Sequence, residues 1–204
     1  MNTVPVQKRM DRLLNELKLN NIRPALLLHV CCAPCSSYVL EYLSEYFDIT
    51  VFFYNPNITP KEEYDHRVRE LMRLVSEMGL SEKVRIVEGE YEPELFFART
   101  KGLEQEPEGG ARCEECFHLR LQKACEYAAA HDCDYVTTTL TISPLKNADL
   151  LNCVGNEEGK KAGVTYLDSD FKKKNGYKRS IELSAIHNLY RQNYCGCIFS
   201  KRDN

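Results

Sequence analysis

Two patterns alternate along the chain: short segments that read as strands, and longer segments in which apolar residues recur at helical spacing. The first short segment, residues 25–30, is a continuous apolar run with the length of a buried strand. The other strand-like segments occupy residues 49–54, 84–87, 134–139 and 164–167. Because strand-like runs separated by helical segments are typical of βαβ units, the pattern predicts a Rossmann-like α/β fold: a parallel sheet of about five strands with helices on both faces.

The segments between the runs predict helices whose apolar residues fall on one stripe. These helices cover residues 5–20, 36–46, 60–78, 92–99, 117–128, 147–161 and 180–193, with a loop expected over 102–112. The third has the clearest start, because Thr59 suits the N-cap, Pro60 the first helical position and Glu62 a capping box. We therefore expect an N-terminal amphipathic helix over residues 1–21 and a single α/β catalytic domain over residues 22–204.

Length and composition narrow the class of protein. The 204 residues, with 43% hydrophobic and 28% charged side chains, are typical of one globular domain with a sizeable core. No window approaches the roughly 18 apolar residues of a membrane span, and the first 21 residues do not resemble a signal peptide. We therefore expect a cytoplasmic protein without a membrane partner. The net charge of −3 means that nucleic-acid binding would need a local basic patch.

Cysteines carry the strongest chemical signal. Seven of the ten fall into three short-spaced groups, which in a reducing compartment point to metal binding or redox chemistry. The groups are Cys31-Cys32-x-x-Cys35, Cys113-x-x-Cys116 and Cys195-x-Cys197. The first follows the first predicted strand, where ligands of parallel sheets bind. Seven thiols exceed the four ligands of one closed zinc or cluster site, so the count predicts two adjacent metal centres.

Other readings of the cysteines stay open at this point. Thiolate ligands suit zinc as well as an iron–sulfur cluster, and a C-x-x-C pair also serves thiol–disulfide exchange. The remaining cysteines have simpler interpretations: Cys125 lies on an apolar helix stripe and is expected in the core, while Cys133 and Cys153 are expected to be structural. His29, inside an apolar run, is expected to be a satisfied core histidine.

Four motifs in this order resemble the metal-dependent epoxyqueuosine reductase family, QueH. They are His29-Val-Cys-Cys-Ala-Pro-Cys35, Tyr54-Asn-Pro-Asn-Ile58 with Glu63, Tyr64 and Arg67, Cys113-x-x-Cys116, and Tyr194-Cys-Gly-Cys197. The resemblance spans roughly residues 22–200. It implies an adenine-nucleotide α-hydrolase-like sheet that carries a [4Fe-4S] cluster beside one additional iron or other divalent metal. It also implies a reaction, the two-electron deoxygenation of epoxyqueuosine to queuosine at anticodon position 34 of tRNA.

The resemblance gives the candidate residues their roles. We assign Cys32, Cys113, Cys116 and Cys195 to the cluster, and Cys31, Cys35 and Cys197 to the second iron. Tyr64, His66 and Tyr194 are candidate proton donors. Contacts with the tRNA substrate are expected from polar residues after the second strand and from a basic, aromatic segment near the last helix. These residues are Asn55, Asn57, Arg67, Lys172, Lys173, Lys174, Lys178 and Arg179.

Two alternative functions remain at this stage. One is a zinc-binding module that binds nucleic acid without catalysis. The other is a cluster-dependent tRNA-thiolation enzyme, which would need a phosphate-binding loop after the first strand. The segment Cys-Cys-Ala-Pro-Cys-Ser-Ser stands there instead. A reductase also needs an electron donor, which the sequence leaves unidentified because it shows no flavin, nicotinamide or cobalamin motif.

Overall fold

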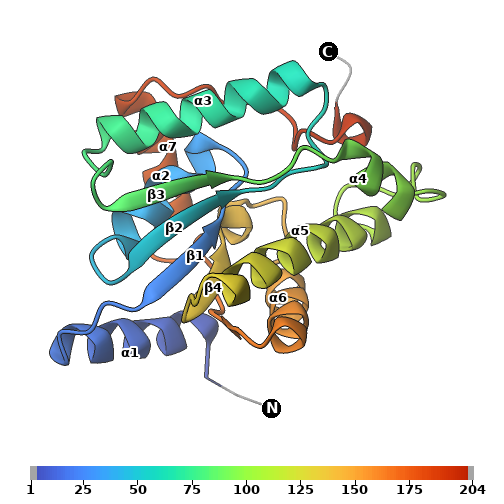
Figure 1. Ribbon diagram of the computed structural model, residues 1–204. Helices are drawn as coiled ribbons and strands as arrows, with labels where there is room; N and C mark the ends of the chain where they lie inside the picture. The colour runs from blue at the N-terminus through green and yellow to red at the C-terminus, as the bar shows by residue number, and fades with distance from the viewer. Residues whose placement is uncertain (1–3, 202–204) are drawn as a thin grey trace.

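The computed structural model describes residues 4–201, which form one five-stranded parallel sheet covered by helices (Figure 1). The strand order is β3-β2-β1-β4-β5, and every neighbouring pair is parallel. The strands are β1 (Ala25–His29), β2 (Asp48–Phe53), β3 (Val84–Glu88), β4 (Tyr135–Thr138) and β5 (Thr165–Tyr166). The predicted fold class and all five predicted strands are therefore confirmed.

Seven α-helices lie within residues 4–201, close to the predicted segments. They are α1 (Val6–Leu19), α2 (Ala33–Leu43), α3 (Lys61–Glu77), α4 (Pro93–Arg99), α5 (Ala111–Ala130), α6 (Ala148–Ala162) and α7 (Gly176–Ile186). Two short 3₁₀ helices follow β4 and the last cysteine pair: η1 (Thr139–Ile142) and η2 (Ile198–Ser200). None of these helices combines the length and apolar character of a membrane span.

Alternating side chains of β1 build two separate cores, one on each face of the sheet. Leu26 and Leu28 pack in one cluster with residues of α1, α2 and α3, whereas Leu27 packs in the other with residues of α5 and α6. Successive strand residues point to opposite faces, and a strand buried on both faces reads as one continuous apolar run. This is why β1 has no polar alternation and sits at the centre of the sheet.

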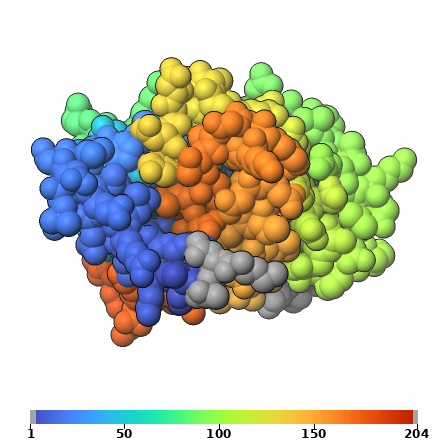
Figure 2. All heavy atoms as spheres, turned by 90° about the horizontal axis from the view of Figure 1, so that it is seen from below, coloured from blue at the N-terminus to red at the C-terminus, as the bar shows by residue number. Residues whose placement is uncertain are grey.

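Helix α1 covers one face of the sheet and lines neither of the cavities described below. Its buried side chains Met10, Leu14 and Leu17 belong to the same core as α2 and α3, so the helix is packed onto the sheet. Figure 2 shows this N-terminal region (blue) and the region around residue 100 (green) at opposite ends of the molecule. The candidate site described below therefore receives no side chain from α1.

Several predicted helix boundaries were wrong, and tertiary contacts explain those of α3 and α7. Helix α5 begins at Ala111, six residues before its predicted start and within the loop expected over 102–112. Helix α3 begins at Lys61 with Pro60 in the N-cap position and without a side-chain cap. The N–H group of Thr59 donates to the carbonyl oxygen of Gly196 at 3.2 Å, so the loop follows the C-terminal segment rather than forming a capping box. Helix α2 begins three residues earlier than expected, which places Cys35 in its first turn.

The last helix is also displaced from its predicted span. Helix α7 begins at Gly176 and ends at Ile186, not at residue 193. Arg73 of α3 donates to the carbonyl oxygen of His187 at 3.0 Å, and Asn188 has a φ angle of +44°, which helices do not contain. Residues 187–193 therefore leave the helix and run toward the sheet edge.

A matched pair of leucines tests the central role of β1. Leu27 is fully buried, so Leu27→Ala should lower the free energy of unfolding by about 2–5 kcal/mol through lost transfer energy and a cavity. Leu19 is 85% exposed, so Leu19→Ala should change it by no more than about 0.5 kcal/mol. Urea unfolding measures both, and equal effects would contradict the described packing.

Candidate metal centre and adjoining pocket

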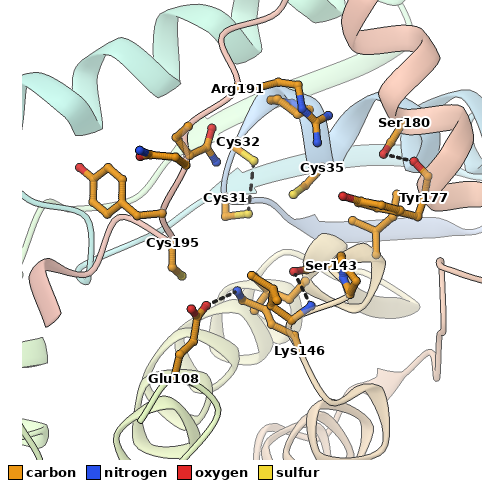
Figure 3. A pocket seen from close by; sticks show the side chains of 18 residues that line it. Cys31, Cys32, Cys35, Glu108, Ser143, Lys146, Tyr177, Ser180, Arg191 and Cys195 are labelled. Atoms are coloured by element: carbon orange, nitrogen blue, oxygen red, sulfur yellow. Dashed lines mark hydrogen bonds and ion pairs between the residues drawn. The ribbon is translucent and has the colours of Figure 1, made fainter. Parts of the chain in front are cut away.

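The candidate site lies where β1 ends and the connections of the sheet diverge. β1 pairs with β2 on one side and with β4 on the other, which makes this a topological switch point. A pocket of about 190 Å³ opens at this edge. Figure 3 shows Cys31, Cys32 and Cys35 on one wall, with Lys146 and Glu108 on the wall that faces them.

Three thiols come together at the start of α2. The sulfur atoms of Cys31, Cys32 and Cys35 all lie within 4.8 Å of one another, and the Cys31 thiol donates to the sulfur of Cys32 at 3.7 Å. Cys32 is the N-cap of α2, where the helix dipole favours a thiolate. Hydrogen bonds with Cys31 and Cys35 hold the pKa of Cys32 well below its usual value, whereas hydrogen bonds with Cys31 and Cys32 raise the pKa of Cys35.

The other four thiols of the three groups line a second, adjoining cavity. Cys113 and Cys116 reach it from the first turns of α5, and Cys195 and Cys197 from the C-terminal segment. Burial raises the pKa of Cys116 to about 12 and also raises that of Cys197. Cys195 lines both cavities, so the two sites share a wall.

This grouping differs from the partition expected from sequence. Cys32 lies with Cys31 and Cys35, whereas Cys197 lies with Cys113 and Cys116. The expected partition placed Cys32 with the cluster and Cys197 with the second iron, because spacing alone does not show which way adjacent thiols point. Which metal each thiol binds stays a prediction. Gly196 separates the last pair with a φ of +105°, and a side chain there would come within 2.8 Å of Ile58. The close approach therefore fits glycine.

Two buried arginines connect the thiol-bearing segments. Arg120 and Arg67 are each 1% exposed. Arg120 Nη2 donates to Asn55 Oδ1 at 2.6 Å, and Asn55 Nδ2 donates to the carbonyl oxygen of Val30 at 2.9 Å, next to Cys31. Arg67 donates to Glu63 at 2.7 Å and to the carbonyl oxygen of Cys195 at 3.0 Å. Asn55 and Arg67 thus have structural partners.

Several buried polar atoms beside the second cavity have no partner within residues 4–201. Both amide atoms of Asn57 are in this state, together with Nε and Nη1 of Arg120. Asn57 and Arg120 line the cavity with the four thiols. A buried donor left unpaired costs about 1–3 kcal/mol, so Asn57 Nδ2 and the two Arg120 nitrogens indicate an absent acceptor. Unpaired donors beside four soft ligands fit an anionic, sulfur-containing metal centre.

The predicted proton donors are not brought together. The ring of Tyr194 lines the first pocket, and burial raises its pKa. Tyr64 is buried in the core against Phe53, its hydroxyl donates to the carbonyl oxygen of Gly89 at 3.2 Å, and burial raises its pKa. His66 packs against the ring of Tyr190. Neither Tyr64 nor His66 belongs to the described lining of either cavity.

The basic segment around α7 is largely paired with acidic side chains. Lys172 lies 3.1 Å from Asp170, Lys174 lies 2.6 Å from Asp11, and Arg179 lies 2.7 Å from Glu41. Lys173 is 3.9 Å from Asp170, with 65% of its side chain exposed. Lys178 is exposed. Tyr177 and Ser180 of the same helix line the first pocket, so this segment stands beside its opening.

Sequence reasoning missed Arg120, Lys146 and Glu108. A signal for Arg120 existed but was hidden by the late predicted start of α5. Arg112, Cys116 and Arg120 recur every fourth residue on one face of α5, and an arginine on a buried stripe needs a partner. Lys146 and Glu108 come from loops with no such pattern. Only the fold brings their carboxylate and ammonium groups to 3.9 Å.

Several residues were expected to have structural roles, and the structure places His29 and Cys125 in the core as predicted. His29 is fully buried, with its ring nitrogens 2.8 Å from Thr138 Oγ1 and 3.1 Å from the carbonyl oxygen of Tyr54. Burial lowers its pKa to about 3, so the ring is neutral. Cys125 is fully buried in the core of α5 and α6. Cys133 is half-buried, whereas Cys153 is exposed on α6.

Fold and site together define a Rossmann-like α/β protein with a thiol-rich centre at the switch point of its sheet. Comparison with known proteins gives the class a name. The sequence model described as "Epoxyqueuosine reductase QueH" matches residues 26–203. The chain belongs to this epoxyqueuosine reductase family and is an oxidoreductase, as the family resemblance predicted.

Relatives from several bacteria share most of the chain. A protein of Streptococcus pyogenes serotype M1 named "Epoxyqueuosine reductase QueH" is 44% identical over 208 residues, which cover 98% of this chain and 82% of the relative. A protein of Staphylococcus epidermidis with the same name is 44% identical, covering 95% and 83%. One from Thermotoga maritima is 34% identical, covering 85% and 88%.

Replacing Asn55 distinguishes a structural role from a substrate-reading role. Asn55→Ala removes a buried hydrogen bond to a charged group and should lower the free energy of unfolding by about 1.5–3 kcal/mol. Asn20→Ala, which removes an exposed hydrogen bond to Glu16, should change it by no more than about 0.5 kcal/mol. Denaturant unfolding of the metal-free proteins measures both. An Asn55 variant of unchanged stability would contradict the structural role.

Proposed function

We propose that the chain reduces epoxyqueuosine in tRNA to queuosine at anticodon position 34, using a [4Fe-4S] cluster and an adjacent second metal. The observation that carries this proposal is the gathering of seven thiols from three distant segments at one sheet edge, in two cavities that share Cys195. The names of the relatives support the substrate, and with it a place in queuosine biosynthesis and tRNA processing.

The two cavities suggest which residues hold each metal group. Four thiols line the second cavity, which matches the four ligands of a [4Fe-4S] cluster. These are Cys113, Cys116, Cys195 and Cys197. Cys31, Cys32 and Cys35 then remain for one further iron or other divalent metal. This proposal exchanges Cys32 and Cys197 relative to the partition made from the sequence, and it keeps the totals of four and three.

The overall reaction consumes two electrons and two protons. Both bonds from carbon to the epoxide oxygen break, a carbon–carbon double bond forms, and the oxygen leaves as water. When bound, the metal groups supply single electrons and a Lewis acid for the oxygen. The residues of the chain orient the substrate: Tyr194 offers a ring at the pocket wall, and Asn57 and Arg120 offer unpaired donors to the cluster side. The electron donor is a separate molecule, not yet identified.

The tRNA would approach from the opening of the pocket. Position 34 lies in the single-stranded anticodon loop, so its base can leave the stack at modest cost. Exposed Lys173 and Lys178 stand near the segment that lines this opening, and Arg191 lines it directly. Lys172, Lys174 and Arg179 are engaged in ion pairs, so they would contact phosphate only by exchanging their acidic partners.

Two alternatives make different predictions. A zinc-binding module for nucleic acid would bind about one metal, lack visible absorbance and show no response to reductant. A tRNA-thiolation enzyme would bind a nucleotide, but the turn after β1 presents three thiols where such enzymes hold phosphate. The family membership of the chain favours the reductase over both.

Anaerobic purification followed by iron and sulfide analysis tests the proposed function. The protein should hold about four irons and four sulfides in the cluster, with further metal at the second site. It should convert tRNA containing epoxyqueuosine to queuosine with dithionite as reductant, detected by nucleoside mass spectrometry. Iron chelation should abolish turnover. A protein with its full cluster that yields no queuosine would exclude the proposed reaction.

Single cysteine replacements test the partition between the two centres. Cys197→Ser should remove most of the cluster absorbance, because the residue lines the four-thiol cavity. Cys32→Ser should keep most of that absorbance but lose the second metal and turnover. Cys153→Ser, on the exposed face of α6, is the matched control and should resemble the wild type. The opposite pattern for Cys197 and Cys32 would restore the partition inferred from the sequence.

A further inference from the structure

The pocket has a cation that none of the roles above uses. Lys146 and Arg191 are the two cationic side chains in the pocket lining within residues 4–201. Arg191 is exposed at the opening and donates to Ser184 at 2.9 Å. The Lys146 side chain is only 11% exposed and stands across the pocket from the thiols of α2 (Figure 3). The two cations therefore lie at different depths.

The backbone holds Lys146 in a fixed position. Its N–H group donates to the carbonyl oxygen of Ser143 at 3.2 Å, and the next residue, Asn147, caps α6 through bonds to Asp149 and Leu150. Lys172 donates to the carbonyl oxygen of Thr141 at 2.9 Å, which secures the start of the same loop. A side chain carried by such a loop is preorganised, as a group that contacts a reacting atom must be.

The carboxylate of Glu108, the acidic side chain that lines the described pocket with Lys146, is partly exposed and can exchange protons with solvent. Glu108 lies 3.9 Å from Lys146 Nζ, and 28% of the Glu108 side chain is exposed. Both residues line both cavities, so the pair stands on the wall shared by the two thiol groups. At 3.9 Å the ion pair is too long for a full hydrogen bond. The ammonium group therefore keeps donor capacity for a bound molecule.

We propose that Lys146 is a catalytic residue that binds the epoxide oxygen through its ammonium group and donates a proton to it as the carbon–oxygen bond breaks. This inference rests on the proposed function. The oxygen gains negative charge as electrons enter from the external one-electron donor. Lys146 supplies one of the two protons that convert the oxygen to water, and solvent returns it through Glu108. The second proton comes from water.

The chemistry of the leaving oxygen requires such a group. Expelled without a proton, the oxygen would depart as hydroxide, a strong base. Burial works against the charged form of Lys146, but the thiols of Cys195, Cys31 and Cys35 outweigh it and raise its pKa, so Lys146 holds its proton until the oxygen becomes basic. An alkylammonium group is still a stronger acid than water and can protonate that oxygen. Arg191 cannot take this role, because a guanidinium does not give up its proton in proteins. Arg191 is instead positioned for a phosphate of the incoming tRNA.

Two replacements of Lys146 separate proton donation from simple charge balance. Lys146→Ala removes both, whereas Lys146→Arg keeps the positive charge beside the thiols but not the transferable proton. Single-turnover rates, measured with dithionite and tRNA containing epoxyqueuosine, should fall about 10²–10⁴-fold in both variants. Iron content and cluster absorbance should match the wild type. Lys160→Met, which removes an exposed cation of α6 that lines neither cavity, is the matched control and should keep the wild-type rate.

Chemical rescue supplies a readout that a structural role would not give. Ethylamine and weaker primary amines, added at equal ammonium concentration, should restore turnover to Lys146→Ala, with rates that follow the acidity of the ammonium ion. Wild-type turnover in Lys146→Arg would overturn the proposal and leave Lys146 as a counter-charge. The proposal would also be overturned if the rates of the Lys146 variants fell only in proportion to their loss of iron. The proposed function fails separately: in that case the wild-type protein itself would be inactive despite a full cluster. Failure of the Lys146 role alone leaves the wild type active.

Discussion

Buried positive charge beside buried thiols is the constraint on which the site depends. An isolated charge in a protein interior costs several kcal/mol, so Arg67 and Arg120 need partners that stay in place. Arg120 reaches Asn55, which in turn holds the end of β1, and Arg67 holds the carbonyl of Cys195. The loop after β2 and the start of α3 thus connect all three cysteine groups. Thiolates bound to a metal would balance the same charges.

The fold followed from local patterns because the strands are short segments rich in leucine, β-branched or aromatic residues, and the helices between them carry apolar stripes. The strand segments and helix stripes are local features of the sequence, and the packed structure keeps them as the elements that they predict. The errors fell where a long-range contact decides the backbone: Thr59 bonds to the C-terminal segment, and the exit of α7 bonds to Arg73. No pattern within a window of a few residues contains either partner.

The residue types of the candidate site were predictable, but their geometry was not. Seven cysteines in three short-spaced groups predicted one shared thiol-rich site, since cysteine spacing is itself a chemical signal. The grouping of Cys32 and Cys197 depends on the turn into α2 and on the path around Gly196, which spacing does not report. Asn55 and Tyr64 belong to the family motif, yet their hydrogen bonds are structural. Lys146 has no motif and emerged only from the fold.

The route of the C-terminal segment has a consequence for biosynthesis. Gly196 packs against Ile58 and Arg67, and its carbonyl accepts from Thr59, so Cys195 and Cys197 are fastened to the middle of the chain. Ribosomes add roughly 5–20 residues each second, so these two thiols emerge many seconds after those of α2. A nascent chain therefore lacks two of the seven grouped thiols until residue 197 has been added. The thiol-rich site is consequently complete only after the C-terminal segment has folded back onto the loop before α3.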